Sequence, residues 1–318
     1  MEYNTTSMDP ELNPPTAPES DPHALRAFTL HDRIWGQNRY VYPVVSRRSH
    51  GLSIGINLNP DKICNFDCIY CSVERAGSQP LTPQSVDLAV LRQELAAMLE
   101  LAATGSIYLF DPFDKIPPTL ARINDIAFSG DGEPTTCPNF GQACQIAVEL
   151  KDHYFPRHSA GVVSNTIPVK IITITNATML QRPAVRDALA FLDQHDGEIW
   201  AKLDAGTEAY YQSIDRSTIS LAHILQNIQS AAQIRSIVIQ SLFMRVHGAS
   251  PPTAEIDAYI AHLAAILQAR GQIKLVQVYT VARLTTEACA TALAAAALAG
   301  IADRIQGTLP HLAVEIYP

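Results

Sequence analysis

Half of the chain's six cysteines lie in one short segment, Cys64-Asn65-Phe66-Asp67-Cys68-Ile69-Tyr70-Cys71. A disulfide between two cysteines this close in the chain would be strained. Thiolates grouped in one loop instead suit a soft metal centre. The segment therefore predicts a metal site whose ligands are Cys64, Cys68 and Cys71.

Three thiolates leave one position open in a centre that takes four ligands, whether a lone zinc ion or a four-iron four-sulfur cluster. An open position distinguishes a catalytic metal site from a closed structural one, because a substrate or cosubstrate can bind the metal there. The C-x-x-x-C-x-x-C spacing also differs from that of ferredoxins and zinc ribbons. The alternative is a structural zinc site closed by one distant side chain, such as His50 or Cys137.

The segment resembles the cluster loop of the radical S-adenosylmethionine (radical SAM) enzymes, which carries this spacing and an aromatic residue before the third cysteine, as Tyr70 is here. In that family the fourth iron of a 4Fe-4S cluster is held by S-adenosyl-L-methionine. An electron from the cluster cleaves this cosubstrate to a 5'-deoxyadenosyl radical, which takes a hydrogen atom from the substrate. The resemblance implies a radical SAM Fe-S oxidoreductase with both cofactors, and places Tyr70 beside them.

Upstream of the cysteines, residues 46–58 pass from polar turn residues into an apolar stretch interrupted by glycine, which predicts a first strand. Residues 46–71 together resemble one subgroup of radical SAM Fe-S oxidoreductases that is related to the tRNA wyosine-base synthases. Arg47 and Arg48 begin this region. They either hold a substrate carboxylate or phosphate as bidentate donors or neutralise the cluster region, and Arg48 is a candidate catalytic residue.

A glycine-rich turn follows the buried strand predicted at residues 123–128. It reads Ser129-Gly130-Asp131-Gly132-Glu133-Pro134-Thr135, with two glycines and a proline around acidic residues. Barrel enzymes place their chemistry in turns at the carboxyl ends of strands. The turn resembles the family motif whose backbone and acidic side chain meet the methionyl ammonium of the cosubstrate, and Gly130, Gly132 and Glu133 are the matching positions.

Asn176 and Asp204 stand at the ends of two further predicted strands, residues 170–176 and 198–206. In the family, polar residues on these strands touch the ribose and carboxylate of the cosubstrate, which makes both residues candidates for cofactor binding. Either side chain can instead cap the turn that follows its strand. Lys202 shares a strand face with Asp204 and is a second candidate catalytic residue, with a salt bridge to Glu133 or Asp204 as its alternative role.

Strands and helices alternate along the chain. Six strands are predicted at residues 46–58, 123–128, 170–176, 198–206, 236–244 and 274–283, and helices at 86–101, 183–194 and 254–270. This alternation predicts an α/β fold, a partial (βα)6 TIM-like barrel with parallel strands, helices outside and the site at the strand carboxyl ends. The residues that we expect to line this mouth are Gln240, Gln277, Tyr279 and Arg283.

Length and composition indicate one catalytic domain. At 318 residues, with 47% hydrophobic and 17% charged residues, the chain has an ordinary globular composition. Residues 1–24 are rich in Pro, Asp, Glu, Ser and Thr, which predicts a disordered tail before a radical SAM domain at 25–318. This domain has an irregular lead-in to residue 45 and a short C-terminal extension, an Ala-rich helix and an edge strand at 312–317.

Location and partners follow from the same composition. The sequence shows no signal peptide or membrane span, and six cysteines do not form a disulfide framework, so we expect a cytoplasmic protein without a membrane partner. Cys137, Cys144 and Cys289 are predicted to be buried structural thiols. The resemblance implies an electron donor such as flavodoxin or ferredoxin, and the substrate is unidentified.

Two other functions stay open. A non-catalytic zinc or Fe-S protein, acting as a sensor or interaction module, would close the metal site with a fourth protein ligand. A tRNA-modifying radical SAM enzyme is disfavoured by the net charge of −8, although a local basic patch would still allow nucleic acid to bind. The chain also has no second group of cysteines like the one that holds the additional cluster of the wyosine synthases.

Overall fold

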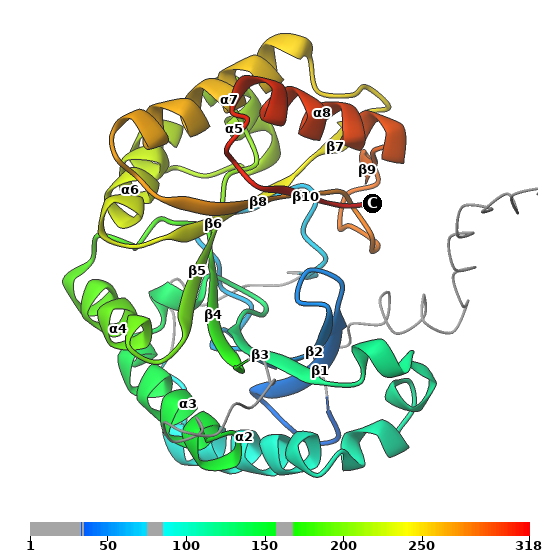
Figure 1. The fold of residues 1–318 in the computed structure, drawn as a ribbon, viewed down its shortest axis with the longest axis vertical. Coiled ribbons are helices and arrows are strands. Elements are labelled where there is room, and N and C mark those ends of the chain that lie inside the picture. Colours follow the sequence, from blue (N-terminus) through cyan, green and yellow to red (C-terminus); the bar gives the residue numbers. More distant parts are fainter. Residues whose placement is uncertain (1–32, 34, 75–84, 157–167) are drawn as a thin grey trace, which may run out of the picture.

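The computed structural model describes residue 33 and residues 35–74, 85–156 and 168–318 of the chain. The predicted tail at residues 1–24 lies outside these described residues, so its disorder stays a prediction. Among the described residues, eight strands form one sheet in the order β1-β2-β3-β4-β5-β6-β8-β10. Figure 1 shows this sheet curving, with the helices along its convex side.

The bounds of the elements are as follows. The strands of the large sheet are β1 (Val41–Ser46), β2 (Gly51–Ile56), β3 (Ile123–Phe128), β4 (Lys170–Thr175), β5 (Gly197–Lys202), β6 (Ile237–Leu242), β8 (Ile273–Tyr279) and β10 (Val314–Tyr317). A small antiparallel pair consists of β7 (Met244–Val246) and β9 (Ala290–Ala292). The α-helices are α2 (Leu88–Ala103), α3 (Phe140–Tyr154), α4 (Pro183–Asp193), α5 (Glu208–Ile214), α6 (Leu221–Ile234), α7 (Thr253–Gln268) and α8 (Ala295–Thr308). Short 3₁₀ turns lie at Ser106–Leu109, Phe113–Lys115, Pro118–Leu120 and Pro134–Thr136.

The six predicted strands correspond to β2, β3, β4, β5, β6 and β8, which pair in parallel in this order. At least one helix separates each strand from the next along the chain. The predicted partial (βα)6 barrel is therefore confirmed. The predicted C-terminal edge strand is β10, which pairs in parallel with β8.

The predicted lead-in is wrong in one respect, because residues 41–46 form a regular strand rather than an irregular segment. This strand, β1, pairs antiparallel with β2, and Pro43 lies opposite Ile54. Proline removes a backbone donor and is tolerated at the edge of a sheet, where β1 lies. The edges at β1 and β10 leave the barrel incomplete.

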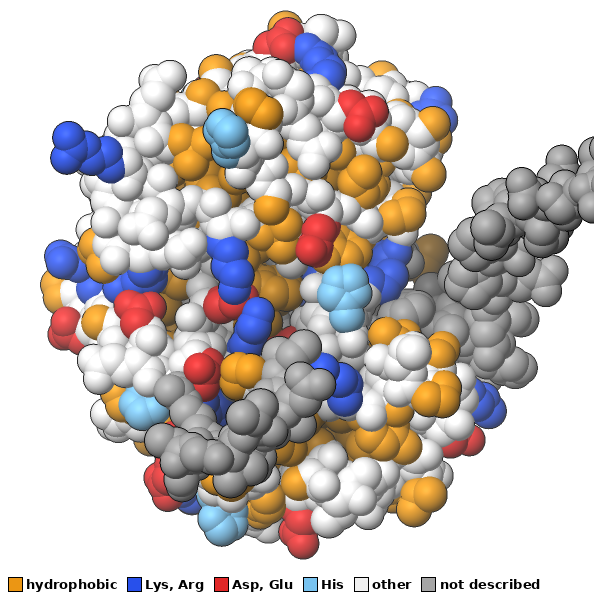
Figure 2. Space-filling view, in the orientation of Figure 1, with side chains coloured by type: hydrophobic (Ala, Val, Ile, Leu, Met, Phe, Trp, Pro, Cys, Tyr) orange, Lys and Arg blue, Asp and Glu red, His pale blue; other side chains and the backbone are white. Residues whose placement is uncertain are grey.

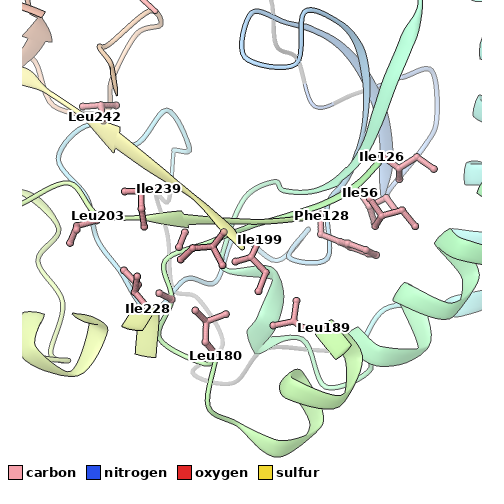
Figure 3. Packing of buried hydrophobic residues seen from close by; sticks show 14 of the residues in the cluster. Ile56, Ile126, Phe128, Leu180, Leu189, Ile199, Leu203, Ile228, Ile239 and Leu242 are labelled. Carbon is pink, nitrogen blue, oxygen red and sulfur yellow. The ribbon is translucent and has the colours of Figure 1, made fainter. Parts of the chain in front are cut away.

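Side chains on the two faces of the sheet meet different surroundings. On the convex face, residues such as Ile126 and Phe128 belong to the main hydrophobic core between the sheet and the helices. Figure 3 shows Phe128, Ile199 and Leu189 in this layer. Residues of the opposite strand phase, Ala127, Ile172, Trp200 and Val238, form a smaller separate cluster on the concave face. The alternation of β-strand side chains thus separates a packed outer layer from a barrel interior that is only partly filled.

The helix predicted at residues 86–101 is α2, whose buried side chains Leu91, Leu95, Met98 and Leu99 recur at helical spacing. Asp87 caps its first turn by accepting hydrogen bonds from the backbone N–H groups of Ala89 and Val90. None of the helices in the described part of the chain combines the length and the apolar character that a membrane span requires.

Candidate active site

The cysteine loop follows β2 and is held in place from both sides. The backbone N–H of Ile69 donates to the carbonyl of Ile214 at 2.8 Å, at the end of α5. The carbonyl of Cys71 accepts from the N–H of Thr286 at 2.8 Å. Within the loop, the N–H of Cys71 donates to the carbonyl of Cys68 at 3.0 Å. These backbone bonds fix the position of the loop without using its thiols.

The three cysteines form no disulfide within the described residues, are half-buried and line one cavity of about 250 Å³. This cavity runs along the barrel interior at the carboxyl ends of the strands, where Ser129 follows β3 and Asn176 follows β4. Burial raises the pKa of Cys68 well above its ordinary value, and the charge of Asp215 adds to this shift. Figure 2 shows a hollow near the centre of the face that is turned toward the viewer, with basic and acidic side chains around it.

The glycine-rich turn lies directly against the start of the cysteine loop. A Cβ atom on Gly132 would lie 2.0 Å from the carbonyl oxygen of Ile63, the residue before Cys64. A Cβ atom on Gly130 would lie 2.3 Å from the side-chain oxygen of Asn57. Real Cβ atoms do not approach this closely, so only glycine allows the two backbones to meet here.

Glu133 is buried, 3% exposed, and its carboxylate joins the turn to the end of β4. One oxygen, Oε1, accepts from the hydroxyl of Thr175 at 2.7 Å and from the backbone and side chain of Thr135. The other, Oε2, accepts from the backbone N–H of Asn176 at 2.7 Å. Burial raises the pKa of Glu133, and these hydrogen bonds oppose the shift. Oε2 keeps acceptor capacity for one further donor from the cavity that Glu133 lines.

Asn176 connects the end of β4 to the cysteine loop. Its amide donates to Oδ1 of Asn65 at 2.7 Å, and its own Oδ1 accepts from the hydroxyl of Thr178 at 2.7 Å. The Asn65 amide in turn donates to the Thr178 hydroxyl at 2.7 Å. Asn176 therefore both caps the turn after its strand and lines the cavity.

Five charged or polar side chains, buried or half-buried, form a cluster next to the cysteine loop. The hydroxyl oxygen of Tyr70 lies 2.5 Å from a carboxylate oxygen of Asp204 and 2.7 Å from one of Asp215, and its single proton serves one of them at a time. Nζ of Lys202 lies 3.0 Å from Asp204 and donates to the hydroxyl of Tyr279 at 2.8 Å. The sequence-derived alternative for Lys202, a salt bridge to Asp204, is confirmed.

Burial and the neighbouring charges raise the pKa values of two members of this cluster, Lys202 and Asp215. Burial opposes the charge of Lys202, but Asp204 and Tyr279 outweigh it and raise the pKa of Lys202. Lys202 therefore stays protonated and acts as a cation rather than as a base. Burial, followed by the charge of Asp204, raises the pKa of Asp215.

The candidate site residues do not all reach the cavity. Its described lining residues include Tyr70, Lys202 and Arg48 but not Asp204, whose two carboxylate oxygens bind Tyr70, Lys202 and the backbone N–H of Leu242. Asp204 positions Lys202 and Tyr70 from behind. A direct contact between Asp204 and a cofactor stays a prediction.

The two distant zinc ligands that the sequence left open lie elsewhere. His50 lies 4.0 Å from Glu315. The thiol of Cys137 donates to Asn139 at 3.1 Å. Neither is among the described residues that line the cavity of the three cysteines. Across the described part of the chain, no three His, Cys, Asp or Glu side chains converge in the way that a single bound ion requires.

The cysteines outside the cysteine loop form no disulfide within the described residues. Cys137 and Cys144 are buried, as predicted, whereas Cys289 is half-buried, with its sulfur 3.7 Å from a carboxylate oxygen of Glu287. The prediction of burial is therefore wrong for Cys289.

Sequence reasoning missed three residues of the site. Asp125 lies on the cavity wall, 1% exposed, and Asp215 belongs to the buried cluster. Arg33 also lines the cavity and pairs with Asp131. An acidic residue in the strand at 123–128, directly before the apolar residues Ile126, Ala127 and Phe128, was a usable signal for Asp125. No local pattern marks Asp215 or Arg33, because distant parts of the chain bring them to the site.

No protein-family model matches the chain. Among curated proteins, a UPF0026 protein of Methanocaldococcus jannaschii is 26% identical over 174 residues, which cover 51% of this chain and 42% of the relative. A UPF0026 protein of Synechocystis is 27% identical over 196 residues, which cover 61% of this chain and 59% of the relative. The chain thus spans less than two thirds of the length of these relatives.

Two solved structures share the architecture. The structure of Streptococcus suis SuiB bound to S-adenosylmethionine aligns with a TM-score of 0.54 at 12% identity, over 86% of this chain and 52% of SuiB. The structure of a radical SAM methyltransferase from Sphaerobacter thermophilus aligns with a TM-score of 0.52 at 11% identity, over 87% of this chain and 68% of the enzyme. At identities this low, the two alignments show a common fold and nothing further.

Proposed function

Since the chain has the fold of the radical SAM enzymes, as the resemblance of its cysteine loop predicted, we propose that it is a radical SAM enzyme. Cys64, Cys68 and Cys71 hold a 4Fe-4S cluster, and S-adenosyl-L-methionine completes it. The observation that carries this proposal is that Cys64, Cys68 and Cys71 line one cavity together with the Gly130–Glu133 turn, at the carboxyl ends of parallel strands.

The donor set supports a cluster. Soft thiolates favour iron–sulfur centres and zinc. All three cysteines of the loop line the same cavity. A cluster offers a separate iron to each thiolate, so its ligands surround it rather than converge on one ion. Metal binding would also offset the raised pKa of Cys68, because a cation stabilises the thiolate.

When bound, the cluster and cosubstrate supply an electron and a 5'-deoxyadenosyl radical. The chain's own residues would bind and orient the cluster and the cosubstrate. Gly130 and Gly132 let the turn approach the cysteine loop, and Oε2 of Glu133 keeps acceptor capacity for the methionyl ammonium. The apolar wall that includes Ile172 and Trp200 excludes water from the interior, which protects a reactive intermediate.

Lys202 supplies a fixed positive charge to the same cavity. Because Asp204 and Tyr279 hold its ammonium group, it can orient an anionic or carbonyl oxygen of a substrate but not remove a proton. Lys202 and Arg48 are thus the candidate residues for contact with substrate. Tyr70 and Asp204 contact Lys202 and act through it as positioning residues.

The wider setting of the reaction is also part of the proposal. The chain is taken to be an oxidoreductase of the cytoplasm, with residues 25–318 as its radical SAM domain. Its electron donor is a flavodoxin or ferredoxin. A tRNA substrate is disfavoured by the net charge of −8.

Anaerobic reconstitution tests the proposal. The purified chain is expected to hold about four irons and, with dithionite and S-adenosyl-L-methionine, to form 5'-deoxyadenosine. Cys68→Ala should lose both properties. Cys289→Ala is the matched control, since Cys289 is equally half-buried but lies outside the cavity lining, and it should keep both. Stoichiometric zinc without cleavage would instead support the non-catalytic metal protein.

A further inference from the structure

A second cavity, of about 240 Å³, adjoins the first at Tyr70 and Cys71. It lies between the turn that joins β1 to β2 and the segment that follows β8. Its wall contains four arginines, and we call it the arginine pocket: Arg33, Arg47, Arg48 and Arg283. No Asp or Glu side chain is among its described lining residues.

Two of the four guanidinium groups donate to an oxygen acceptor, and the other two form no hydrogen bond or ion pair within the described residues. Arg33 pairs with Asp131, and Arg47 donates to the backbone oxygen of Pro318. Arg48 lies over the ring of Tyr279, 4.7 Å from its centroid, a contact that leaves its N–H groups unused. Within the described residues, neither Arg48 nor Arg283 forms an ion pair with a carboxylate.

The arginine charges act on one another. Burial, followed by the charges of Arg48 and Arg33, lowers the pKa of Arg283 to about 9. Burial and then Arg48 also lower the pKa of Arg47. Arg48 and Arg283 are partly buried like charges with no ion-pair partner in the described structure, which is costly, and a bound anion would remove that cost.

We propose that the arginine pocket binds the phosphate group of a phosphorylated small-molecule substrate. This proposal rests on the proposed radical SAM function. Arg48 and Arg283 are the direct donors, and Arg33 and Arg47 add positive potential from the sides. A phosphate dianion matches two unpaired guanidinium groups in charge and offers oxygens to both forks, whereas a carboxylate neutralises only one.

The position of the pocket determines what else the ligand reaches. Arg48, Arg283, Tyr70 and Cys71 line both cavities, so a phosphate held here leaves the remainder of a small molecule directed at the cavity of the three cysteines. The concentrated positive charge is local, since the whole chain carries a net charge of −8. Such a balance favours a small anion over a nucleic acid that would need a long basic track.

Isothermal titration calorimetry on the reconstituted holoenzyme, under anaerobic conditions, tests the proposal with inorganic phosphate, acetate and a tRNA as probes. Phosphate should bind to the wild-type chain at least about tenfold more tightly than acetate. Arg48→Gln combined with Arg283→Gln should weaken phosphate binding at least about tenfold. Arg186→Gln, an exposed arginine on α4, is the matched control and should bind phosphate as the wild type does.

The double variant Arg48→Lys with Arg283→Lys keeps both charges but loses the planar forks, so its affinity should be intermediate. Equal phosphate affinity in the wild type and both double variants would overturn the proposal. So would acetate binding as tight as phosphate, or tRNA that displaces phosphate. Phosphate binding with no iron in the reconstituted chain would count against the radical SAM function alone, whereas iron and cosubstrate cleavage without phosphate binding would count against the pocket alone.

Discussion

The hydroxyl of Tyr70 donates a 2.5 Å hydrogen bond to Asp204, a residue 134 positions further along the chain. The same hydroxyl oxygen also lies within hydrogen-bond distance of Asp215, at 2.7 Å. One side chain next to the third cysteine thus ties the cysteine loop to the end of β5 and to the residue after α5. Both acceptors are buried, so neither finds a replacement donor easily.

Tyr70→Phe should destabilise the chain. It removes the one proton that lies between two buried carboxyl groups, and losing a buried hydrogen bond costs about 1–3 kcal/mol. We expect the free energy of unfolding, measured by urea denaturation of the metal-free chain, to fall by about 2 kcal/mol or more. Tyr108→Phe is the control, because the Tyr108 hydroxyl has no hydrogen-bond partner among the described residues. An equal loss in both variants would show that the Tyr70 hydrogen bonds carry no particular weight.

Gly132→Ala should displace the cysteine loop. Its new Cβ would meet the Ile63 carbonyl oxygen at 2.0 Å, and this atom is backbone that cannot rotate away. Iron bound per chain after reconstitution should fall to less than about half, with a lower melting temperature. Gly141→Ala, in α3, is the control. The nearest atom to its new Cβ is that of Ala188 in α4, 3.8 Å away, and alanine should stabilise α3. Normal iron content in Gly132→Ala would contradict the close packing of the turn against the loop.

Lys202→Met should be far more damaging than a comparable change at the surface. It leaves the carboxylate of Asp204, which is 2% exposed, without its cation. Because 19% of the Lys202 side chain is exposed, we expect the lower end of the range for buried pairs, about 3 kcal/mol. Lys274→Met, at an ion pair with Glu198 in which the lysine side chain is 52% exposed, should cost less than about 1 kcal/mol.

A second substitution separates charge from packing at Lys202. If the cost comes from the uncompensated carboxylate, adding Asp204→Asn to Lys202→Met should recover part of the lost free energy of unfolding. No recovery in this double variant would assign the loss to packing instead.

Asp125→Asn should change how stability depends on pH. Burial raises the pKa of Asp125 to about 6 from an ordinary value of 3.8, while hydroxyl groups including that of Ser53 oppose the shift. The carboxylate oxygen Oδ2 has no hydrogen-bond partner within the described structure, although the side chain of Ser49 is near enough to affect the pKa. Between these two values the folded chain holds a proton that the unfolded chain has released. The free energy of unfolding therefore falls as the pH rises through about 4 to 6.

The size of this effect follows from the two pKa values and is about 3 kcal/mol at most. Asp125→Asn cannot lose the proton, so its unfolding free energy should exceed that of the wild type by about 1–3 kcal/mol at pH 7 and by almost nothing near pH 4. Asp187→Asn, at an exposed position on α4, should change stability by less than about 0.5 kcal/mol. A pH-independent difference in urea denaturation would contradict this account.

Regular elements with a strong local pattern were predicted well. The strand at residues 123–128 has the observed bounds of β3, because an apolar run bounded by turn residues is a local property. No prediction was made for α6, although Leu221, Ile224, Ile228 and Ala231 are buried at helical spacing. The strand β1 was not predicted, and it contains Pro43. A proline argues against a strand unless the strand lies at an edge of a sheet. Which strands lie at an edge depends on the whole sheet.

Candidate site residues were predicted as a group but not in their separate roles. The glycine-rich turn and the cysteines do line one cavity, because parallel strands bring their carboxyl ends to the same side. Asp204 was placed at the correct strand end, yet its side chain lies behind Lys202, where it positions other residues. Which polar group at a strand end faces the cavity depends on the neighbours it binds, and these come from distant segments.

Short-range patterns alone were enough to predict three neighbouring cysteines that line one cavity and a barrel of alternating strands and helices. Ligand spacing and side-chain periodicity are properties of residues close in the chain, so they can be read without coordinates. The arginine pocket and the unpaired oxygen of Asp125 required the folded chain. Both depend on burial and on charges that approach one another only after strand curvature and register are set, and desolvation, which raises or lowers a pKa, has no counterpart in a linear sequence.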